Sequence, residues 1–109
     1  MVRIPENWWH DFPPEYGFRG QKYEQAGRVV EAHWVATEQR LDALVRGRDG
    51  KVYDVRIRLP GPGEEPRKGV EGRCTCPVAF NCKHVAAVMI AVHRGFPVKD
   101  DPDAAPEGG

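Results

Sequence analysis

Apolar and polar residues alternate along residues 27–59, which is the pattern of strands that bury one face. The inward positions fall into three groups: Val30, Ala32, Trp34 and Ala36, then Leu41, Ala43 and Val45, then Tyr53, Val55, Ile57 and Leu59. Asp49-Gly50 predicts a two-residue hairpin turn between the second and third groups. The pattern therefore predicts a three-stranded antiparallel meander with one buried face.

The hydrophobic period lengthens toward the C-terminal part of the chain. Val85, Val88, Met89 and Val92 are spaced as one face of a helix, and Gly95 and Pro97 end the pattern. A loop over 60–69 and a short strand over about 70–76 precede this helix. The sequence predicts an α+β fold in which a small antiparallel meander is followed by a segment with a single C-terminal helix.

The two ends of the chain differ from this body in composition. Residues 1–19 mix aromatic residues with prolines, which predicts an extended arm packed onto the body or an exposed aromatic docking surface. Residues 97–109 are acidic and rich in proline, which predicts a disordered tail. We therefore expect one domain over 20–96, composed of the meander (27–59), the loop (60–69) and a final unit (70–95).

The stretch CTCPVAFNCKH holds every cysteine of the chain. Cys74 and Cys76 lie two apart at a predicted strand end, where i and i+2 side chains share a face. Cys82 and His84 open the predicted helix, and both can reach one ion only if Cys82 lies at or before its first position. Three sulfurs and one nitrogen suit a tetrahedral ion, for which zinc fits better than iron. Four protein ligands leave no position for water, so the predicted role is structural.

Three other interpretations of the cysteines carry less support. A disulfide between Cys74 and Cys76 would be strained and would leave Cys82 unpaired. A catalytic pair of Cys82 and His84 would have nucleophile and base adjacent in sequence rather than assembled in space. Buried, inert cysteines are the third alternative.

The spacing C-x-C-(x5)-C-x-H, followed by an apolar helix, resembles the SWIM-type zinc finger, and CTCPVAFNCKHVAAVMIA is similar to that motif in detail. The resemblance implies that Cys74, Cys76, Cys82 and His84 bind one zinc ion in a zinc-clasped ββα-type finger. It also implies binding to DNA or to proteins, because such modules occur beside helicase ATPases, transposases and recombination accessory proteins. The chain has none of those catalytic parts, so the resemblance does not identify the partner of this module.

The net charge of zero conceals a basic body between acidic ends. Residues 1–18 carry −2, residues 19–99 carry +6 and residues 100–109 carry −4. A candidate phosphate-binding patch lies near the predicted hairpin: Arg46, Arg48, Lys51, Arg56 and Arg58. The alternative is that these arginines form cross-strand pairs with Asp42 and Asp54.

We therefore expect a zinc-stabilised accessory module that binds nucleic acid, DNA rather than RNA. The alternative is a protein-interaction module of a helicase or recombination assembly. No constellation outside the cysteine cluster predicts an enzyme or a small-molecule substrate. The chain lacks a secretory signal pattern and a membrane-spanning run, and three cysteines do not suit a disulfide framework, so a reducing cytoplasmic compartment is expected.

Overall fold

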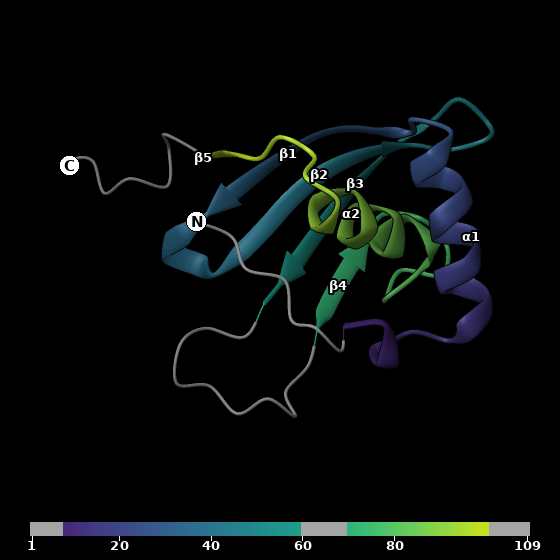
Figure 1. Ribbon diagram of the computed structural model, residues 1–109, viewed down its shortest axis with the longest axis horizontal. Coiled ribbons are helices and arrows are strands. Elements are labelled where there is room, and N and C mark those ends of the chain that lie inside the picture. The colour runs from purple at the N-terminus through teal and green to yellow at the C-terminus, as the bar shows by residue number, and fades with distance from the viewer. Residues whose placement is uncertain (1–7, 60–69, 101–109) are drawn as a thin grey trace.

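A computed structural model describes residues 8–59 and 70–100 of the chain, and its elements form an α+β fold (Figure 1). Two α-helices accompany one five-stranded mixed sheet, whose strand order is β4-β3-β2-β1-β5. The strands are β1 (Val29–Val35), β2 (Arg40–Arg46), β3 (Val52–Arg58), β4 (Glu71–Cys74) and β5 (Lys99–Asp100). The helices are α1 (Pro14–Gln25) and α2 (Lys83–His93), and two 3-10 turns are η1 (Trp8–Asp11) and η2 (Ala36–Glu38).

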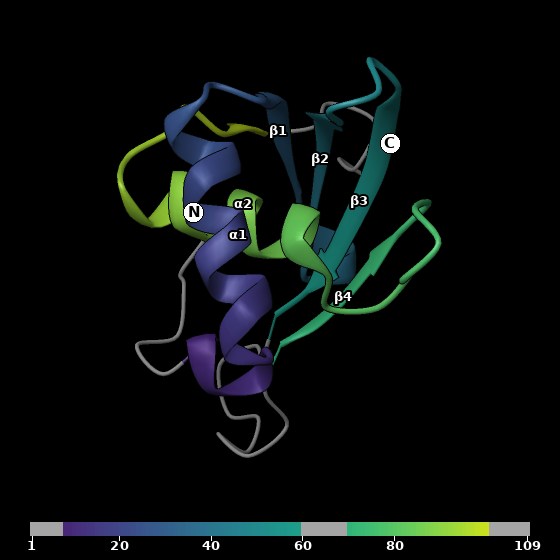
Figure 2. The same ribbon diagram turned by 90° about the vertical axis from the view of Figure 1, so that its right-hand side faces the viewer.

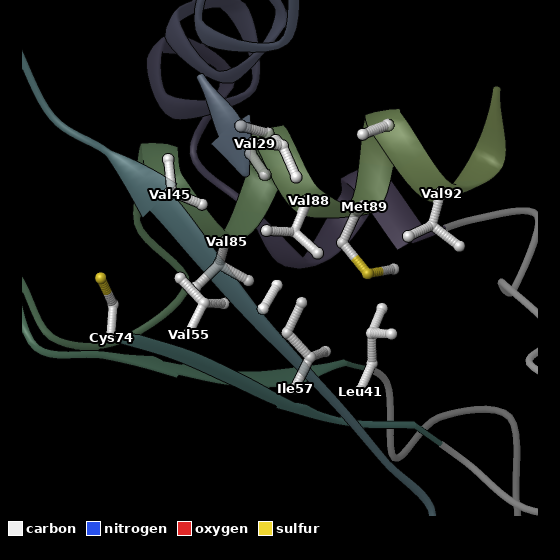
Figure 3. Packing of buried hydrophobic residues seen from close by; sticks show 14 of the residues in the cluster. Val29, Leu41, Val45, Val55, Ile57, Cys74, Val85, Val88, Met89 and Val92 are labelled. Atoms are coloured by element: carbon white, nitrogen blue, oxygen red, sulfur yellow. The ribbon is translucent and has the colours of Figure 1, made fainter. Parts of the chain in front are cut away.

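Both helices lie on the same face of the sheet, and α2 lies between the sheet and α1 (Figure 2). The predicted stripe on α2 faces the strands: Val85, Val88 and Met89 are fully buried against residues such as Leu41 and Ile57 (Figure 3). The opposite side of α2 is covered by α1, so α2 is apolar around most of its circumference. The other face of the sheet is mainly polar, although Val52 is 49% exposed on it, and it has no helix over it in the described residues.

The meander forms as predicted, with three local differences. Ala36 is exposed and belongs to η2, so it does not extend the buried face of β1. A bulge between Val29 and Glu31 shifts the register of β1, so that Val29 is buried while Val30 is 44% exposed. The hairpin loop between β2 and β3 is longer than two residues, because the Gly47 amide donates to the Lys51 carbonyl and the Gly50 amide donates to the Gly47 carbonyl. Gly50 has φ of +85°, which closes this three-residue connection.

The prediction of an extended N-terminal arm over 1–19 is wrong for residues 8–19, which belong to η1 and to the first part of α1. Pro14 stands at the first helical position, where its missing amide costs no hydrogen bond. Trp8 and Phe12 pack edge to face with ring centroids 5.5 Å apart and are buried. Only Gly20 and Tyr23 of α1 are buried, so this helix lacks an apolar stripe that periodicity could detect.

The prediction of a disordered C-terminal tail is wrong for its first part. Lys99 and Asp100 pair with His33 and Trp34 of β1 as a short parallel strand, which makes the sheet mixed rather than purely antiparallel. The predicted loop over 60–69, residues 1–7 of the predicted arm and the acidic residues 101–109 lie outside the described residues, so the proposed domain limits stay predictions. Neither α-helix has the length and apolar character needed to cross a bilayer in the part of the chain that the structure describes.

Candidate metal centre

Four potential metal ligands converge where the edge strand β4 meets the start of α2. The ligand atoms of Cys74, Cys76, Cys82 and His84 all lie within 4.8 Å of one another. All four side chains are buried, with exposed fractions between 1% for Cys82 and 8% for Cys74. Cys74 ends β4 and Cys82 is the N-cap residue of α2 in an extended conformation, as the C-x-H spacing requires. The cluster joins the sheet to the helix.

The segment between Cys74 and Cys82 folds back along β4. Strand β4 ends at Cys74, so Cys76 reaches the cluster from a turn and not from the extended strand that the C-x-C spacing suggested. The Cys74 amide donates to the Ala79 carbonyl at 2.8 Å, and Phe80 forms a bridge with Arg73. Ala79 has a positive φ of 70°, which turns the chain back toward the strand.

Asn81 fastens the returning chain to β4. Its side-chain oxygen accepts a hydrogen bond from the Gly72 amide at 2.8 Å, and its amide group donates to the Val70 carbonyl at 3.1 Å. Asn81 has φ of 43°, a left-handed conformation that asparagine tolerates better than most residues. Gly72 allows the close approach, because a Cβ there would lie 2.2 Å from the Val85 side chain. These contacts place Cys82 beside Cys74.

The distances within the cluster fit a tetrahedral zinc ion. His84 Nδ1 lies 3.6 Å from the sulfur of Cys74 and 3.6 Å from the sulfur of Cys82. Zinc bonds of about 2.3 Å to sulfur and about 2.0 Å to nitrogen, at a tetrahedral angle, place the nitrogen about 3.5 Å from the sulfur. The Cys3His site is therefore suited to one structural zinc ion. The ion would hold β4 to α2 and would have no open position for a substrate.

Two tyrosine rings fix the orientation of His84. The Tyr53 ring stacks on the imidazole at 4.6 Å, and the Tyr23 ring meets it edge to face at 5.2 Å. His84 Nε2 is buried and has no hydrogen-bond partner among the described residues. A metal-binding histidine is usually oriented by a hydrogen bond from its second nitrogen. Here ring packing holds the imidazole so that Nδ1 faces the sulfurs.

Hydrogen bonding between two of the thiols shifts their pKa values in opposite directions. The hydrogen bond from the Cys74 side chain lowers the pKa of Cys82 to about 4, against the opposing effect of burial. The same hydrogen bond and burial raise the pKa of Cys74 above its ordinary value. The pair therefore offers a thiolate to a divalent cation at neutral pH, and binding of the cation displaces the proton that the two thiols share.

The fold and the cluster define a small α+β protein whose Cys3His centre binds zinc structurally. A comparison with protein-family models matches residues 53–93 to the SWIM zinc finger. No curated protein and no solved structure matches the chain. The chain therefore carries a zinc-binding SWIM domain. The match covers β3 from its second residue, β4, the segment over 75–82 (hereafter the zinc loop) and α2, whereas α1, β1 and β2 lie N-terminal to it.

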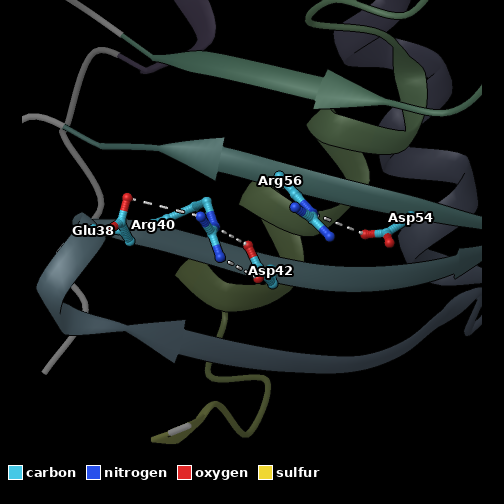
Figure 4. A network of polar contacts seen from close by, with 5 residues as sticks. All are labelled: Glu38, Arg40, Asp42, Asp54 and Arg56. Atoms are coloured by element: carbon cyan, nitrogen blue, oxygen red, sulfur yellow. Dashed lines mark hydrogen bonds and ion pairs between the residues drawn. The ribbon is translucent and has the colours of Figure 1, made fainter. Parts of the chain in front are cut away.

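The basic residues singled out from the sequence lie in different places. Arg46, Arg56 and Arg58 lie on the open face of the sheet, whereas Lys51 and Arg48 belong to the hairpin loop. Asp42 is opposite Arg56 in the register, yet the ion pairs form within strands: Arg40 with Asp42, and Arg56 with Asp54 at 3.7 Å (Figure 4). Binding of nucleic acid by this group of five stays a prediction.

A second basic surface, of which the sequence analysis singled out only Arg48, lies on the helix side of the molecule beside the zinc centre. We call it the basic hollow: a concavity of about 600 Å³ lined by Arg19, Lys22, Arg28, Arg48 and Lys83 around Tyr23. Arg28 and Lys83 lie over the Tyr23 ring at 5.3 and 5.2 Å. The cations come from four separate segments, so no local sequence pattern could have grouped them.

Proposed function

We propose that this zinc-binding SWIM domain binds nucleic acid, with DNA as the first candidate, and that it acts as a non-catalytic accessory factor. The observation that carries the proposal is the basic hollow. Its lining includes five cationic side chains and no carboxylate. Among lysines and arginines of residues 8–59 and 70–100, only Arg40, Arg56 and Arg94 form ion pairs with carboxylates. The cations of the hollow are thus available to an external anion.

The hollow has more positive charge than is needed to neutralise the zinc centre beside it. Three thiolates on a divalent ion leave a single net negative charge at the cluster. Five cations line the neighbouring hollow, and Lys83 lies between the ligands Cys82 and His84 in sequence. Mutual repulsion of like charges favours an anion in the hollow. The repeating phosphates of a nucleic acid satisfy that requirement through several contacts at once.

The proposal is tested by binding of the zinc-loaded chain to fluorescent DNA and RNA oligonucleotides over a series of salt concentrations. We expect affinity to fall steeply with salt, since each phosphate contact contributes about −0.7 to −0.9 to the slope of log K against log salt. A lack of binding to every oligonucleotide at low salt would overturn the proposal. Binding that is insensitive to salt would overturn its electrostatic basis.

A second candidate function is docking of another protein, for example a helicase ATPase, and a different surface favours it. Val78 and Phe80 on the zinc loop are 49% and 50% exposed, which is unusual for large apolar side chains so close together. Affinity purification with the wild type and with Phe80→Ser tests this candidate. A partner retained by the wild type and lost by Phe80→Ser would support it, whereas equal recovery would count against this surface.

A further inference from the structure

A second, smaller hollow adjoins the basic hollow and has a different chemistry. We call it the apolar hollow: about 350 Å³, with Tyr53, Pro77 and Val78 beside the ligands Cys76 and His84. Tyr23, Arg48 and Lys83 line both hollows, so the two are neighbouring parts of one surface. Val78 is 49% exposed at this position. A ligand that spans the surface therefore meets cations on one side and apolar atoms on the other.

The lining of the apolar hollow includes one carboxylate, and this carboxylate already accepts hydrogen bonds within the protein. Asp49 accepts hydrogen bonds from the Lys51 amide at 3.0 Å and from the Tyr53 hydroxyl at 2.9 Å. These hydrogen bonds hold the pKa of Asp49 below its usual value, so the group stays ionised. An anion is disfavoured beside Asp49, whereas a flat uncharged group is not. The basic hollow thus suits a charged part of a ligand, and the apolar hollow suits an uncharged part of the same ligand.

An unpaired nucleotide offers both a charged phosphate and an accessible uncharged base. A nucleotide in a duplex does not offer the face of its base. In a duplex the bases are stacked and paired inside, and only the phosphates and the base edges face a protein. In a single strand the phosphates can follow a basic groove while a base turns aside onto an apolar or aromatic surface. The two hollows lie side by side, so one nucleotide unit can occupy both.

We propose that the paired hollows bind single-stranded nucleic acid in preference to duplex, with phosphates in the basic hollow and one base in the apolar hollow against Val78. This inference rests on the proposed function and adds the form of the nucleic acid and its location. It places the binding surface on the helix side, beside the zinc centre. The open face of the sheet, with the arginines of β3, is then not the principal site.

The test compares two charge-matched double variants of the zinc-loaded full chain. Arg19→Glu with Lys22→Glu changes the basic hollow, and Arg56→Glu with Arg58→Glu changes the sheet by the same charge. All four side chains are exposed, so zinc content and circular dichroism should stay at wild-type values. Anisotropy is measured with a labelled thymidine dodecamer, alone and paired with its complement. We expect the wild type to bind the single strand at least about fivefold more tightly than the duplex.

The hollow variant should bind the single strand at least about tenfold more weakly, with a salt slope smaller by about 1.4 if two phosphate contacts are lost. The sheet variant should lose no more than about threefold. Equal losses in the two variants, or a larger loss in the sheet variant, would overturn the location and leave nucleic-acid binding intact. Duplex binding as tight as single-strand binding would overturn the single-strand preference. No binding by the wild type would overturn the proposed function itself.

Val78→Ser tests the base position without altering charge. Loss of a stacking or apolar contact with one base corresponds to roughly 5- to 150-fold in affinity, and Val78 supplies part of that surface. We expect a loss of at least about threefold for the single strand, little change for the duplex and no change in the salt slope. Unchanged single-strand affinity would exclude the apolar hollow from the site. If the double Glu variant loses zinc, Arg19→Gln with Lys22→Gln takes its place, and the same ordering of affinities applies.

Discussion

The molecule has two basic surfaces, and they differ in how many of their cations pair with carboxylates. Arg40 and Arg56 of the sheet face do so, whereas Arg46 and Arg58 have no ion pair with a carboxylate of the described residues. On the open sheet face, Arg40 donates two hydrogen bonds to Asp42, and Arg56 lies 3.7 Å from Asp54. On the helix side, the cations of the basic hollow have no ion pair with a carboxylate among the described residues. Counting charges along the sequence does not distinguish these cases. On a strand, a carboxylate two residues away shares the same face and is a ready partner.

The two surfaces also depend on different parts of the structure. The sheet face belongs to strands held by the apolar core, in which Leu41, Val55 and Ile57 are fully buried. The basic hollow depends on α1, on the hairpin loop and on Lys83 at the start of α2. Its central ring, Tyr23, packs against the ligand His84. We therefore expect changes at the zinc centre and at the helix contact to damage the hollow before they damage the sheet.

Loss of zinc should have the largest effect. Cys82→Ser removes the ligand at the N-cap of α2, and zinc per chain should fall from about one to near zero. Structural zinc in finger peptides contributes about 10 kcal/mol or more of apparent binding free energy, which is comparable with the total stability of a small domain. We expect a much lower melting temperature and loss of oligonucleotide binding, measured by metal analysis and thermal denaturation.

His93→Gln is the matched control for this substitution, because His93 lies on the same helix but is exposed and outside the cluster. It should retain zinc and the wild-type melting temperature. Acidification should release zinc from the wild type, since protons compete with the ion for the thiolates and His84. A Cys82→Ser protein with full zinc content would contradict the assignment of this ligand.

The contact between α1 and α2 should give the next largest effect. A Cβ on Gly20 would lie 2.6 Å from the Ala86 Cβ and 2.9 Å from the Ala87 backbone nitrogen. Gly20→Ala should therefore push α1 away from α2 and destabilise the fold by about 1–3 kcal/mol. It should also weaken oligonucleotide binding, since α1 carries Arg19 and Lys22. Denaturant unfolding of the zinc-loaded protein measures the change in stability.

Gly17→Ala, on the same helix, should change the stability of the protein in the opposite direction. A Cβ at Gly17 meets no other atom within 4 Å, so the substitution only improves helix propensity. It should stabilise the protein by about 0.5–1 kcal/mol. A similar destabilisation by both substitutions would show that α1 is not held by close contact at Gly20.

The same helix shows what the sequence could and could not predict. Strand alternation and the helical stripe of α2 depend on local burial patterns, so β1–β3 and α2 were predicted from them. Helix α1 contacts α2 through a glycine and a tyrosine, and a glycine contact leaves no hydrophobic signal. Strand β5 is two residues long and owes its place to pairing with β1. Neither element could be found from residue patterns.

The site divides in the same way. The four zinc ligands lie within eleven residues, and their spacing identifies them because each pair follows from a local turn or helix start. Tyr23 and Tyr53 orient His84 from distant segments, and the basic hollow is also assembled from separate segments. Such residues come together only through tertiary structure. Sequence spacing thus predicts the metal centre, whereas the residues around it can be identified only from the tertiary structure.

Tyr23 should give a smaller effect that links the zinc centre to the hollow. Its ring contacts His84 and lies under Arg28 and Lys83. Tyr23→Leu keeps an apolar side chain but removes the ring, and should cost about 1 kcal/mol in stability. Tyr23→Phe retains the ring contacts and should stay close to the wild type. Equal melting temperatures for the Leu and Phe variants would contradict a role for the ring.

Release of the paired arginines on the sheet should give the smallest effect and tests the comparison most directly. The ion pair of Arg56 and Asp54 joins half-exposed groups, and that of Arg40 and Asp42 joins side chains 30% and 24% exposed. Such pairs contribute about 0–1 kcal/mol each. Asp42→Asn with Asp54→Asn should therefore change stability little while freeing Arg56 and removing one of the carboxylate partners of Arg40, which keeps its ion pair with Glu38.

If pairing is what distinguishes the two surfaces, this double variant should bind oligonucleotides more tightly by up to about threefold at low salt, with a slightly steeper salt slope. Adding Arg56→Gln should reverse most of the gain, because it removes the cation that Asp54→Asn frees. Unchanged affinity in the double Asn variant would mean that the shape of the hollow, rather than the lack of ion pairs, decides where an anion binds. A gain of tenfold or more would mean that the sheet face competes with the hollow once its carboxylates are neutral.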